Sequence, residues 1–417
     1  MRSAILNVGT EILFGQIVNT NAVYLSRELN NMGIDVLFHY TVGDNDGRLA
    51  EIIEEAFRHV DLIVTTGGLG PTEDDLTKET ACKVMHDELA VHAESLRELE
   101  NYMKTRGRKM TENNYKQAMM PTRAVVFDNE TGTAPGFALS ENGKTIVCMP
   151  GPPREMTWMW ENRVKPYLAK FSDGVIEYKV LRFFGIGESL LETKLLPLID
   201  GQTDPTVATY AKEGECTVRV ASKRATREEA EAAVNAMCGK ISELVGEYIY
   251  SFDGKDLNEV VCGELLSRGM SLSACESCTG GEFSHMVVSV PGMSEVFDRG
   301  LVTYTHRAKQ EELGVSEKTL EKYTAESPEV AAEMANGLLA KTGSDICVSS
   351  TGVAGPGSYG PHEAGTMFVG IACKNGYTAV RKIETHRDDR RWNRYFCCLC
   401  MFDEIRKALK THTPAEV

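Results

Sequence analysis

The sequence predicts an α/β protein with a parallel-sheet N-terminal domain, a small α+β middle domain and an α/β C-terminal domain. Three observations indicate this arrangement. Apolar strand patterns alternate with helix patterns over about the first 80 residues, the rhythm changes between about 175 and 250, and the alternation resumes after the polar stretch SFDGKD. A chain of 417 residues has room for two or three domains. The domains expected are residues 1–172, 173–252 and 253–417.

The first domain is predicted as a series of strand–helix–strand units. An apolar run at 3–9 and a strand-like segment at 34–44 flank a helical pattern at 20–33. A second helical pattern at 46–60 leads to the apolar strand at 61–70, which runs into a glycine turn. Strands separated by such helices pair in parallel, and their ligand sites lie at the carboxyl ends of the strands. We therefore expect functional residues directly after each strand.

The middle section has a different pattern and carries no convincing chemistry. Strand patterns at 175–184 and 206–222 alternate with helical patterns at 188–199 and 228–245. The glycines near its start lack the third glycine of a dinucleotide fingerprint. We expect this section to space two sites or to build a dimer.

Composition excludes several classes of protein. The 45 basic and 60 acidic residues give a formal charge of −15, which argues against broad nucleic-acid binding. No run of about 18 apolar residues is present, and the first residues do not have the pattern of a signal peptide, so we expect a cytoplasmic protein without a membrane partner. The 12 cysteines are scattered, which favours reduced, mostly buried thiols over disulfides or a zinc site.

A glycine-rich turn with acids is the first candidate site. In TTGGLGPTEDD, Gly67 and Gly68 would let the backbone approach a phosphate. Acids after this strand and after two earlier ones would hold a divalent cation that bridges the phosphates. These acids are Glu11, Asp44, Asp74 and Asp75. The residues alone favour the simpler alternative, tight-turn glycines with solvated acids.

The segment CESCTGG forms the second candidate site, between a predicted strand and a helix that begins near Glu282. Ser277 would lie at a helix N-terminus, where free amides stabilise an oxyanion. A serine needs a base, and no His–Asp pair is evident. Lys309 is the candidate, because a partly buried lysine with a lowered pKa can accept the serine proton. The residues alone favour an ordinary helix cap at Ser277 and a surface cation at Lys309.

Three N-terminal motifs carry a family resemblance. GTEILFGQIVNTN, TTGGLGPTEDDLT and MPGPPREM, in this order, resemble the first half of the CinA (competence-damage-inducible) family, whose first domain is similar to molybdopterin-binding domains. The resemblance implies hydrolysis of the ADP-ribose pyrophosphate bond with a divalent metal: Mg, Mn or Co. It puts Asp75 at the aspartate of the family's glycine motif and Asp44 at the acid after the second strand. Asn21 is implied as a nucleotide contact, with a helix cap as the alternative.

Three C-terminal motifs extend the resemblance. ESCTGG, RGLVTYTHRAK and STGVAGPG resemble the C-terminal CinA domain, which acts in its family as a nicotinamide mononucleotide deamidase without a cofactor. This implies that Ser277 is the nucleophile and Lys309 its base, supported by Tyr304 and Thr279. The implied substrate-binding residues are Gly280, Gly281, Thr351, Gly352, Gly355, Arg387 and Arg391. The loop 358–364 departs from the family pattern, because it lacks a lysine.

Together these features indicate a bifunctional hydrolase of pyridine-nucleotide recycling. Its expected partners are nicotinamide mononucleotide, ADP-ribose and a second copy of the chain, with no nucleic acid. The alternative is a molybdopterin- or nucleotide-binding protein, or a competence-related regulatory protein, without turnover.

Overall fold

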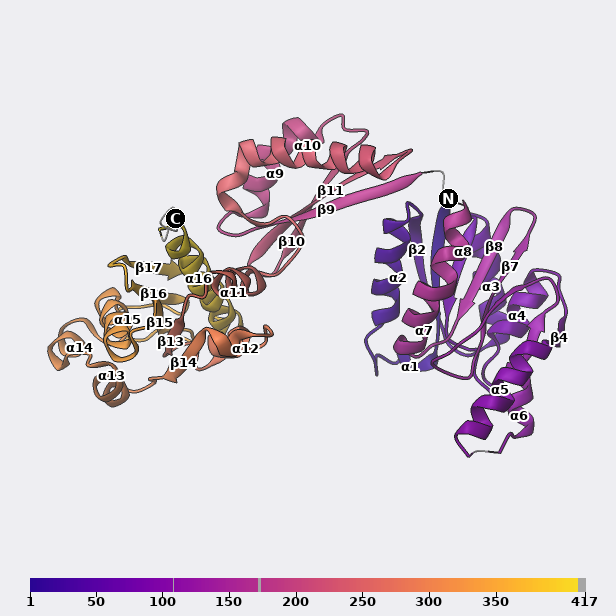
Figure 1. Ribbon diagram of the computed structural model, residues 1–417, viewed down its shortest axis with the longest axis horizontal. Coiled ribbons are helices and arrows are strands. Elements are labelled where there is room, and N and C mark those ends of the chain that lie inside the picture. The colour runs from indigo at the N-terminus through magenta and orange to yellow at the C-terminus, as the bar shows by residue number, and fades with distance from the viewer. Residues whose placement is uncertain (108, 172–173, 412–417) are drawn as a thin grey trace. The chain divides into compact units, whose positions relative to one another are not determined.

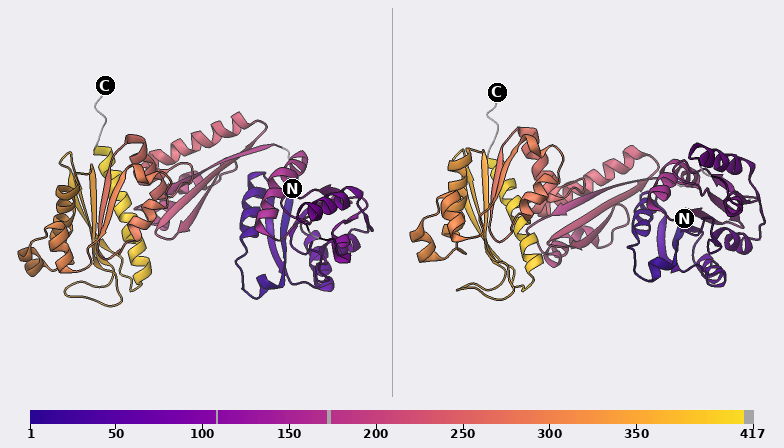
Figure 2. Two further views of the ribbon diagram at one scale, coloured as in Figure 1. Left: turned by 60° about the horizontal axis from the view of Figure 1, so that its bottom comes forward. Right: turned by 90° about the horizontal axis from the view of Figure 1, so that it is seen from below.

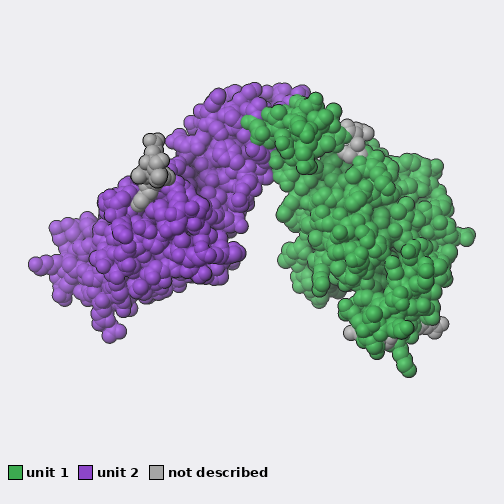
Figure 3. All heavy atoms as spheres, viewed as in Figure 1, with its two compact units in different colours: residues 1–178, 221–235 green, residues 179–220, 236–417 purple. Residues whose placement is uncertain are grey.

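The computed structural model describes residues 1–107, 109–171 and 174–411 (Figure 1). The chain divides into two compact units, 1–178 with 221–235 and 179–220 with 236–417 (Figure 3). The expected boundary between residues 172 and 173 lies outside the described residues. The second expected boundary falls in the turn between β12 (Ile249–Ser251) and α11 (Leu257–Arg268).

The N-terminal sheet is mixed but mostly parallel. It has six strands in the order β2-β1-β3-β8-β7-β6. The first four pair in parallel, whereas β7 and β6 add antiparallel pairs at one edge. The predicted parallel-sheet domain is thus confirmed, with an antiparallel edge that the sequence did not indicate. The strands are β1 (Arg2–Val8), β2 (Asp35–Val42), β3 (Leu62–Thr66), β6 (Val125–Phe127), β7 (Gly136–Glu141) and β8 (Lys144–Met149).

Helices cover both faces of this sheet, as the alternation along β1 requires. Leu6 packs in the cluster formed with α3 and α4, whereas its neighbour Ile5 packs in the cluster formed with α2 and α7. Asn19 and Asn45 cap α2 and α3 by accepting hydrogen bonds from helical amides. The helices are α1 (Thr10–Leu13), α2 (Thr20–Asn31), α3 (Asp46–Phe57), α4 (Thr77–Val84), α5 (Ala93–Thr105), α6 (Glu112–Gln117), α7 (Pro153–Met159) and α8 (Lys165–Leu168), and β4 (Leu89–Val91) pairs with β5 (Met119–Pro121).

The middle segment forms the predicted α+β pattern. Its four-stranded antiparallel sheet has the order β10-β11-β9-β12. The predicted helix at 188–199 is α9 and the one at 228–245 is α10. The elements are β9 (Val175–Phe183), α9 (Glu188–Ile199), β10 (Thr206–Lys212), β11 (Glu215–Arg224) and α10 (Arg227–Val245).

The C-terminal sheet has the order β14-β13-β15-β16-β17. Strands β14, β13 and β15 are parallel, and β16 and β17 add antiparallel pairs, which confirms an α/β domain. Helices flank both faces of the sheet (Figure 2). The strands are β13 (Leu272–Glu276), β14 (Phe297–Val302), β15 (Ile346–Val353), β16 (Thr366–Cys373) and β17 (Thr378–Glu384); the helices after α11 are α12 (Glu282–Val288), α13 (His306–Leu313), α14 (Glu317–Tyr323), α15 (Pro328–Thr342) and α16 (Arg390–Thr411).

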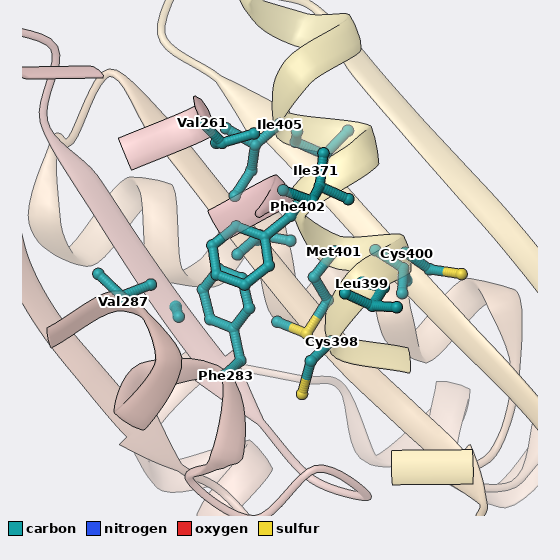
Figure 4. Close-up of a cluster of buried hydrophobic side chains, with 14 of the residues drawn as sticks. Val261, Phe283, Val287, Ile371, Cys398, Leu399, Cys400, Met401, Phe402 and Ile405 are labelled. Carbon is teal, nitrogen blue, oxygen red and sulfur yellow. The ribbon is translucent and has the colours of Figure 1, made fainter. Parts of the chain in front are cut away.

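The larger C-terminal core lies between this sheet and helices α11, α12 and α16 (Figure 4). Phe283 of α12 and Phe402 of α16 meet there with ring centroids 4.5 Å apart. All twelve cysteines of the chain are buried and unpaired, as the sequence predicts. No helix in the described part of the chain is both long and apolar enough to cross a membrane.

Candidate functional site

A cavity of about 470 Å³ lies at the carboxyl ends of the parallel strands of the N-terminal sheet. Its walls come from loops that follow β1, β2, β3 and β8, the places where a parallel sheet presents ligand-binding residues. Six residues expected in this site line the cavity: Glu11, Asp44, Gly67, Gly68, Asp74 and Asp75.

Close packing explains the two glycines of the turn after β3. A Cβ on Gly67 would lie 2.1 Å from the carbonyl oxygen of Val8, and one on Gly68 would lie 2.1 Å from Oγ1 of Thr77. Both glycines have positive φ angles, 104° and 67°. The Gly67 amide donates to the carbonyl oxygen of Met149 at 3.0 Å. The turn therefore needs both glycines even without a phosphate, and one of the two amides is already used.

Threonines hold two of the acids at the cavity. Oδ2 of Asp44 accepts from the amide and hydroxyl of Thr10 at 3.1 and 2.7 Å. Oδ2 of Asp75 accepts from the amide and hydroxyl of Thr72 at 2.9 and 2.6 Å. The other oxygen of each carboxylate, Oδ1, makes no hydrogen bond to a residue that the structure describes. Each acid is thus fixed through one oxygen and offers the second to a ligand.

The four acids do not form a metal cage by themselves. Glu11 and Asp74 are exposed. Among the described residues, no three His, Cys, Asp or Glu side chains gather closely enough to hold a metal ion. Magnesium in nucleotide sites is often held by one or two carboxylates and completed by phosphate oxygens and water. The donor set of Asp44 and Asp75 fits that arrangement, because both acids line one cavity.

Two amide side chains differ from expectation. Asn21 does not line the cavity; its Nδ2 donates to Thr66 Oγ1 at 2.9 Å and to the Gly151 carbonyl at 2.8 Å, and so ties α2 to the loop after β8. Sequence analysis missed Gln117, which lines the cavity and is 1% exposed. Its Nε2 donates to Thr133 Oγ1 at 3.1 Å, and its Oε1 has no partner among the described residues. No motif marks Gln117 in the sequence.

A second cavity, of about 310 Å³, lies at the carboxyl ends of β13, β14 and β15. Four of its lining residues are expected from the sequence: Ser277, Tyr304, Gly352 and Gly355. Five further lining residues carry functional groups that sequence analysis did not select: Cys278, Glu326, Ser358, Tyr359 and Arg390.

Ser277 and Lys309 lie in direct contact. Nζ of Lys309 donates to Ser277 Oγ at 3.0 Å and to the Thr303 carbonyl oxygen at 3.0 Å. Lys309 is 1% exposed and Ser277 is 8% exposed. Burial lowers the pKa of Lys309, while the negative charge of Glu326 acts in the opposite direction. The lysine is therefore a buried group with a lowered pKa, not the surface cation that the residues alone favoured.

Glu276, which sequence analysis missed, organises the turn after Ser277. Its fully buried carboxylate accepts from the amides of Gly281, Phe283 and Ser284 at 2.9, 3.1 and 2.9 Å and from the Ser284 hydroxyl at 2.6 Å. These amides at the start of α12 are thus occupied, contrary to the expectation that they are free for an oxyanion. The turn also contains Gly280 and Gly281, which have φ angles of 60° and 95° and lie outside the cavity lining.

Two threonines expected at the site are buried behind the residues that line the cavity. Thr279 is fully buried; its Oγ1 lies 2.7 Å from Ser350 Oγ, and its carbonyl oxygen accepts from Arg394 Nη2 at 2.6 Å. Thr351 is also fully buried, and its hydroxyl donates to the Ala325 carbonyl oxygen at 2.7 Å. Neither residue lines the cavity. Both hold the loops that form its walls.

The structure brings a different arginine to the cavity from those expected. Arg387 lies over an indole ring of α16, 4.2 Å from its centroid, and Arg391 is exposed. Neither lines the cavity. Arg390 does line it, donating from Nη1 to the Gly355 carbonyl at 2.6 Å and from Nη2 to the Tyr304 hydroxyl at 3.1 Å. The positive charge at this cavity therefore comes from the first residue of α16.

Comparison with known proteins gives the family. A Clostridium botulinum (strain Loch Maree) protein whose name refers to competence-damage induction is 44% identical over 411 residues, which cover 98% of this chain and 100% of that protein. A CinA-like protein of Dictyoglomus turgidum is 44% identical over 410 residues, covering 98% and 99%. The chain belongs to the CinA family. Models of a probable molybdopterin binding domain, a CinA KH domain and the CinA C-terminal domain match residues 4–170, 178–251 and 254–409.

Two solved structures match part of this CinA-family chain. The crystal structure of CinA from Thermoplasma acidophilum is 32% identical and covers 40% of this chain and 96% of that one, with a TM-score of 0.37. A CinA-superfamily structure from Escherichia coli is 28% identical and covers 36% of this chain and 88% of that one, with a TM-score of 0.34.

The segment that matches the KH-domain model lacks the motif with which KH domains bind nucleic acid. KH domains clamp nucleic acid with a G-x-x-G loop, and the sequence of residues 178–251 contains no such motif.

Proposed function

We propose that the C-terminal domain deamidates nicotinamide mononucleotide to nicotinate mononucleotide and ammonia. The observation that carries the proposal is the 3.0 Å hydrogen bond between Lys309 Nζ and Ser277 Oγ beside a cavity of about 310 Å³. A buried lysine with a lowered pKa is a suitable base for a serine nucleophile. The resemblance of ESCTGG and the two motifs after it to the C-terminal CinA domain supports the choice of substrate.

In the proposed reaction, neutral Lys309 takes the proton of Ser277 as Oγ bonds to the carboxamide carbon. The tetrahedral intermediate collapses with cleavage of the carbon–nitrogen bond, and Lys309 gives its proton to the leaving nitrogen, which departs as ammonia. Water then attacks the resulting ester and gives a proton to Lys309. When the ester bond breaks, this proton returns to Ser277 Oγ and nicotinate mononucleotide leaves.

Positive charge is needed for the 5′-phosphate of this substrate. We assign that role to Arg390, because it lines the cavity and its guanidinium already contacts the Tyr304 hydroxyl. Arg387 and Arg391 lie outside the lining, so their expected contribution requires a substrate that extends beyond the cavity.

The test uses the full chain with nicotinamide mononucleotide, measuring released ammonia and nicotinate mononucleotide. Wild type should turn over, whereas Ser277→Ala and Lys309→Ala should lose ammonia release while keeping the wild-type unfolding profile. Lys318→Ala, which removes an exposed lysine of α14, is the matched control and should keep full activity. An inert wild type, or an active Ser277→Ala, would overturn the proposal.

For the N-terminal domain we propose hydrolysis of the ADP-ribose pyrophosphate bond with a divalent metal: Mg, Mn or Co. The observation that favours it is the free Oδ1 of Asp44 and of Asp75 at one cavity of about 470 Å³. When bound, a divalent cation would polarise the pyrophosphate oxygens. Asp44 and Asp75 would hold the cation, and their threonine partners would keep each carboxylate oriented. Turnover that EDTA and Asp75→Asn abolish supports this; binding without turnover supports the molybdopterin- or nucleotide-binding alternative.

We also propose that the protein works as a homodimer in the cytoplasm, within pyridine-nucleotide recycling. Light scattering on the purified chain tests the dimer, and a monomer would contradict it. A competence-related regulatory role without turnover remains the alternative if neither nucleotide is hydrolysed.

A further inference from the structure

Glu326 lines the C-terminal cavity and, in the described part of the structure, has a buried carboxylate oxygen without a hydrogen-bond partner. The residue lies in the connection between α14 and α15 and lines the cavity together with Ser277. Its Oε2 is buried and accepts no hydrogen bond from any described residue. No ion pair joins Glu326 to Lys309 in the described structure. A buried carboxylate oxygen without a partner is costly, so a ligand group that complements it would gain affinity.

The backbone around Glu326 is held in a strained, well-fixed conformation. Thr324 has a φ of 66° and a ψ of 166°, values that a residue with a β-branched side chain rarely adopts. The Thr351 hydroxyl fixes the next residue by donating to the Ala325 carbonyl at 2.7 Å, and the Ser327 hydroxyl donates to the Thr324 carbonyl at 3.0 Å. Contacts on both sides therefore hold Glu326 at the cavity before any ligand binds.

The proposed substrate has a charge that matches this carboxylate. The ring of nicotinamide mononucleotide is a pyridinium, which carries a fixed positive charge, and its phosphate lies at the other end of the molecule. The cavity lining likewise carries one carboxylate, Glu326, and one guanidinium, Arg390. Lys309 must be neutral to act as the base, so it does not compete with the substrate as a counter-charge for Glu326.

We propose that Glu326 is a specificity-determining residue whose carboxylate pairs with the cationic pyridinium ring of the bound nucleotide. The site would thereby favour N-ribosylated, positively charged pyridine carboxamides over neutral ones. This inference rests on the deamidase function proposed above.

The test compares two ligands that differ in ring charge: nicotinamide mononucleotide and its 1,4-dihydro form, which has a neutral ring and the same carboxamide, ribose and phosphate. Binding is measured by calorimetry on full-length Ser277→Ala, where no turnover occurs. Adding Glu326→Gln should weaken binding of the cationic ligand about tenfold, equivalent to about 1.4 kcal/mol, and leave the neutral ligand unchanged. Glu326→Asp, which keeps the charge, should keep most of the preference. Glu329→Gln, an exposed glutamate on α15, is the matched control.

Equal weakening of both ligands, or no change in either, would overturn the inference. If Glu326 acts only through the pKa of Lys309, Glu326→Gln should shift the pH profile of the active enzyme and leave the preference between the two ligands unchanged. That result would also overturn the inference. If wild type deamidates nicotinamide mononucleotide and Glu326→Gln keeps the wild-type KM, only this inference fails. If wild type neither binds nor deamidates the nucleotide, the proposed function and this inference fail together.

Discussion

Replacing Glu276 by glutamine tests whether its carboxylate holds the turn after Ser277. The two carboxylate oxygens each accept two hydrogen bonds, one pair from the amides of Gly281 and Phe283 and the other from the amide and hydroxyl of Ser284. A glutamine has one acceptor oxygen and one NH₂ group. If its oxygen takes the first pair, its NH₂ faces Ser284, where the hydroxyl can turn to accept but the amide cannot.

The expected loss in the free energy of unfolding follows from the number of hydrogen bonds that the glutamine cannot accept. The bond from the Ser284 amide is lost, which leaves that amide unpaired, and the remaining hydrogen bonds lose the negative charge of the carboxylate. Together these changes should lower the free energy of unfolding by about 1.5–3 kcal/mol. Ser284→Ala, which removes only the hydroxyl bond, should cost about 1 kcal/mol. Because Glu276 directly precedes Ser277, Glu276→Gln should also lower kcat about tenfold or more.

Calorimetric unfolding and ammonia release measure both effects in the full chain. The two compact units provide an internal control, because the transition of the N-terminal unit should not move. A Glu276→Gln protein that unfolds like wild type and keeps its kcat would refute the argument that this carboxylate positions the turn. Equal losses in Glu276→Gln and Ser284→Ala would refute the assignment of the cost to an unpaired amide.

Four further outcomes are expected. In a pH profile of ammonia release, kcat/KM should rise with pH on the acid side, because only neutral Lys309 accepts a proton. Burial lowers the pKa of Lys309, so the midpoint of this rise should lie below the pKa of an ordinary lysine. Glu326→Gln should move that midpoint to lower pH, because the Glu326 charge raises the pKa of Lys309. Gly352→Ala should destabilise the C-terminal domain by about 1–3 kcal/mol in urea unfolding, because its Cβ would lie 2.4 Å from the α-carbon of Met367. Arg390→Ala should raise KM for nicotinamide mononucleotide about tenfold, whereas Arg391→Ala should change it little.

The sequence predicts the order of elements because hydrophobic periodicity is local. The helical patterns at 20–33 and 46–60 correspond to α2 (Thr20–Asn31) and α3 (Asp46–Phe57). The antiparallel strands β7 and β6 were not predicted, since strand direction depends on which strands pair across the sheet. Short apolar segments give no information about pairing partners.

The arginine that lines the C-terminal cavity was not among those expected from the sequence. Arg387 and Arg391 are four positions apart, but α16 begins at Arg390, so Arg387 precedes the helix. On the helix, Arg390 and Arg394 are four apart and share a face, and Arg391 is turned away from it by about 100°. Arg390 therefore lines the cavity and Arg394 binds the turn after Ser277. The resemblance implied Arg387 and Arg391 by family position, whereas the residue at which α16 begins decides which arginines reach the cavity.

The proton affinity of Lys309 depends on a balance that no local pattern encodes. Burial favours the neutral amine, whereas the negative charge of Glu326 favours the ammonium form. A base acts best when its pKa lies near the working pH, so the opposed effects of burial and of the Glu326 charge both bear on the proposed role of Lys309. Glu326 follows Lys309 by 17 residues in sequence, and the α14–α15 connection places Glu326 in the lining of the cavity that Ser277 also lines. The proposed catalytic pair is thus indicated by motifs, but the position of the Glu326 charge beside it depends on the packing of a separate loop against β15 through the Thr351 hydroxyl.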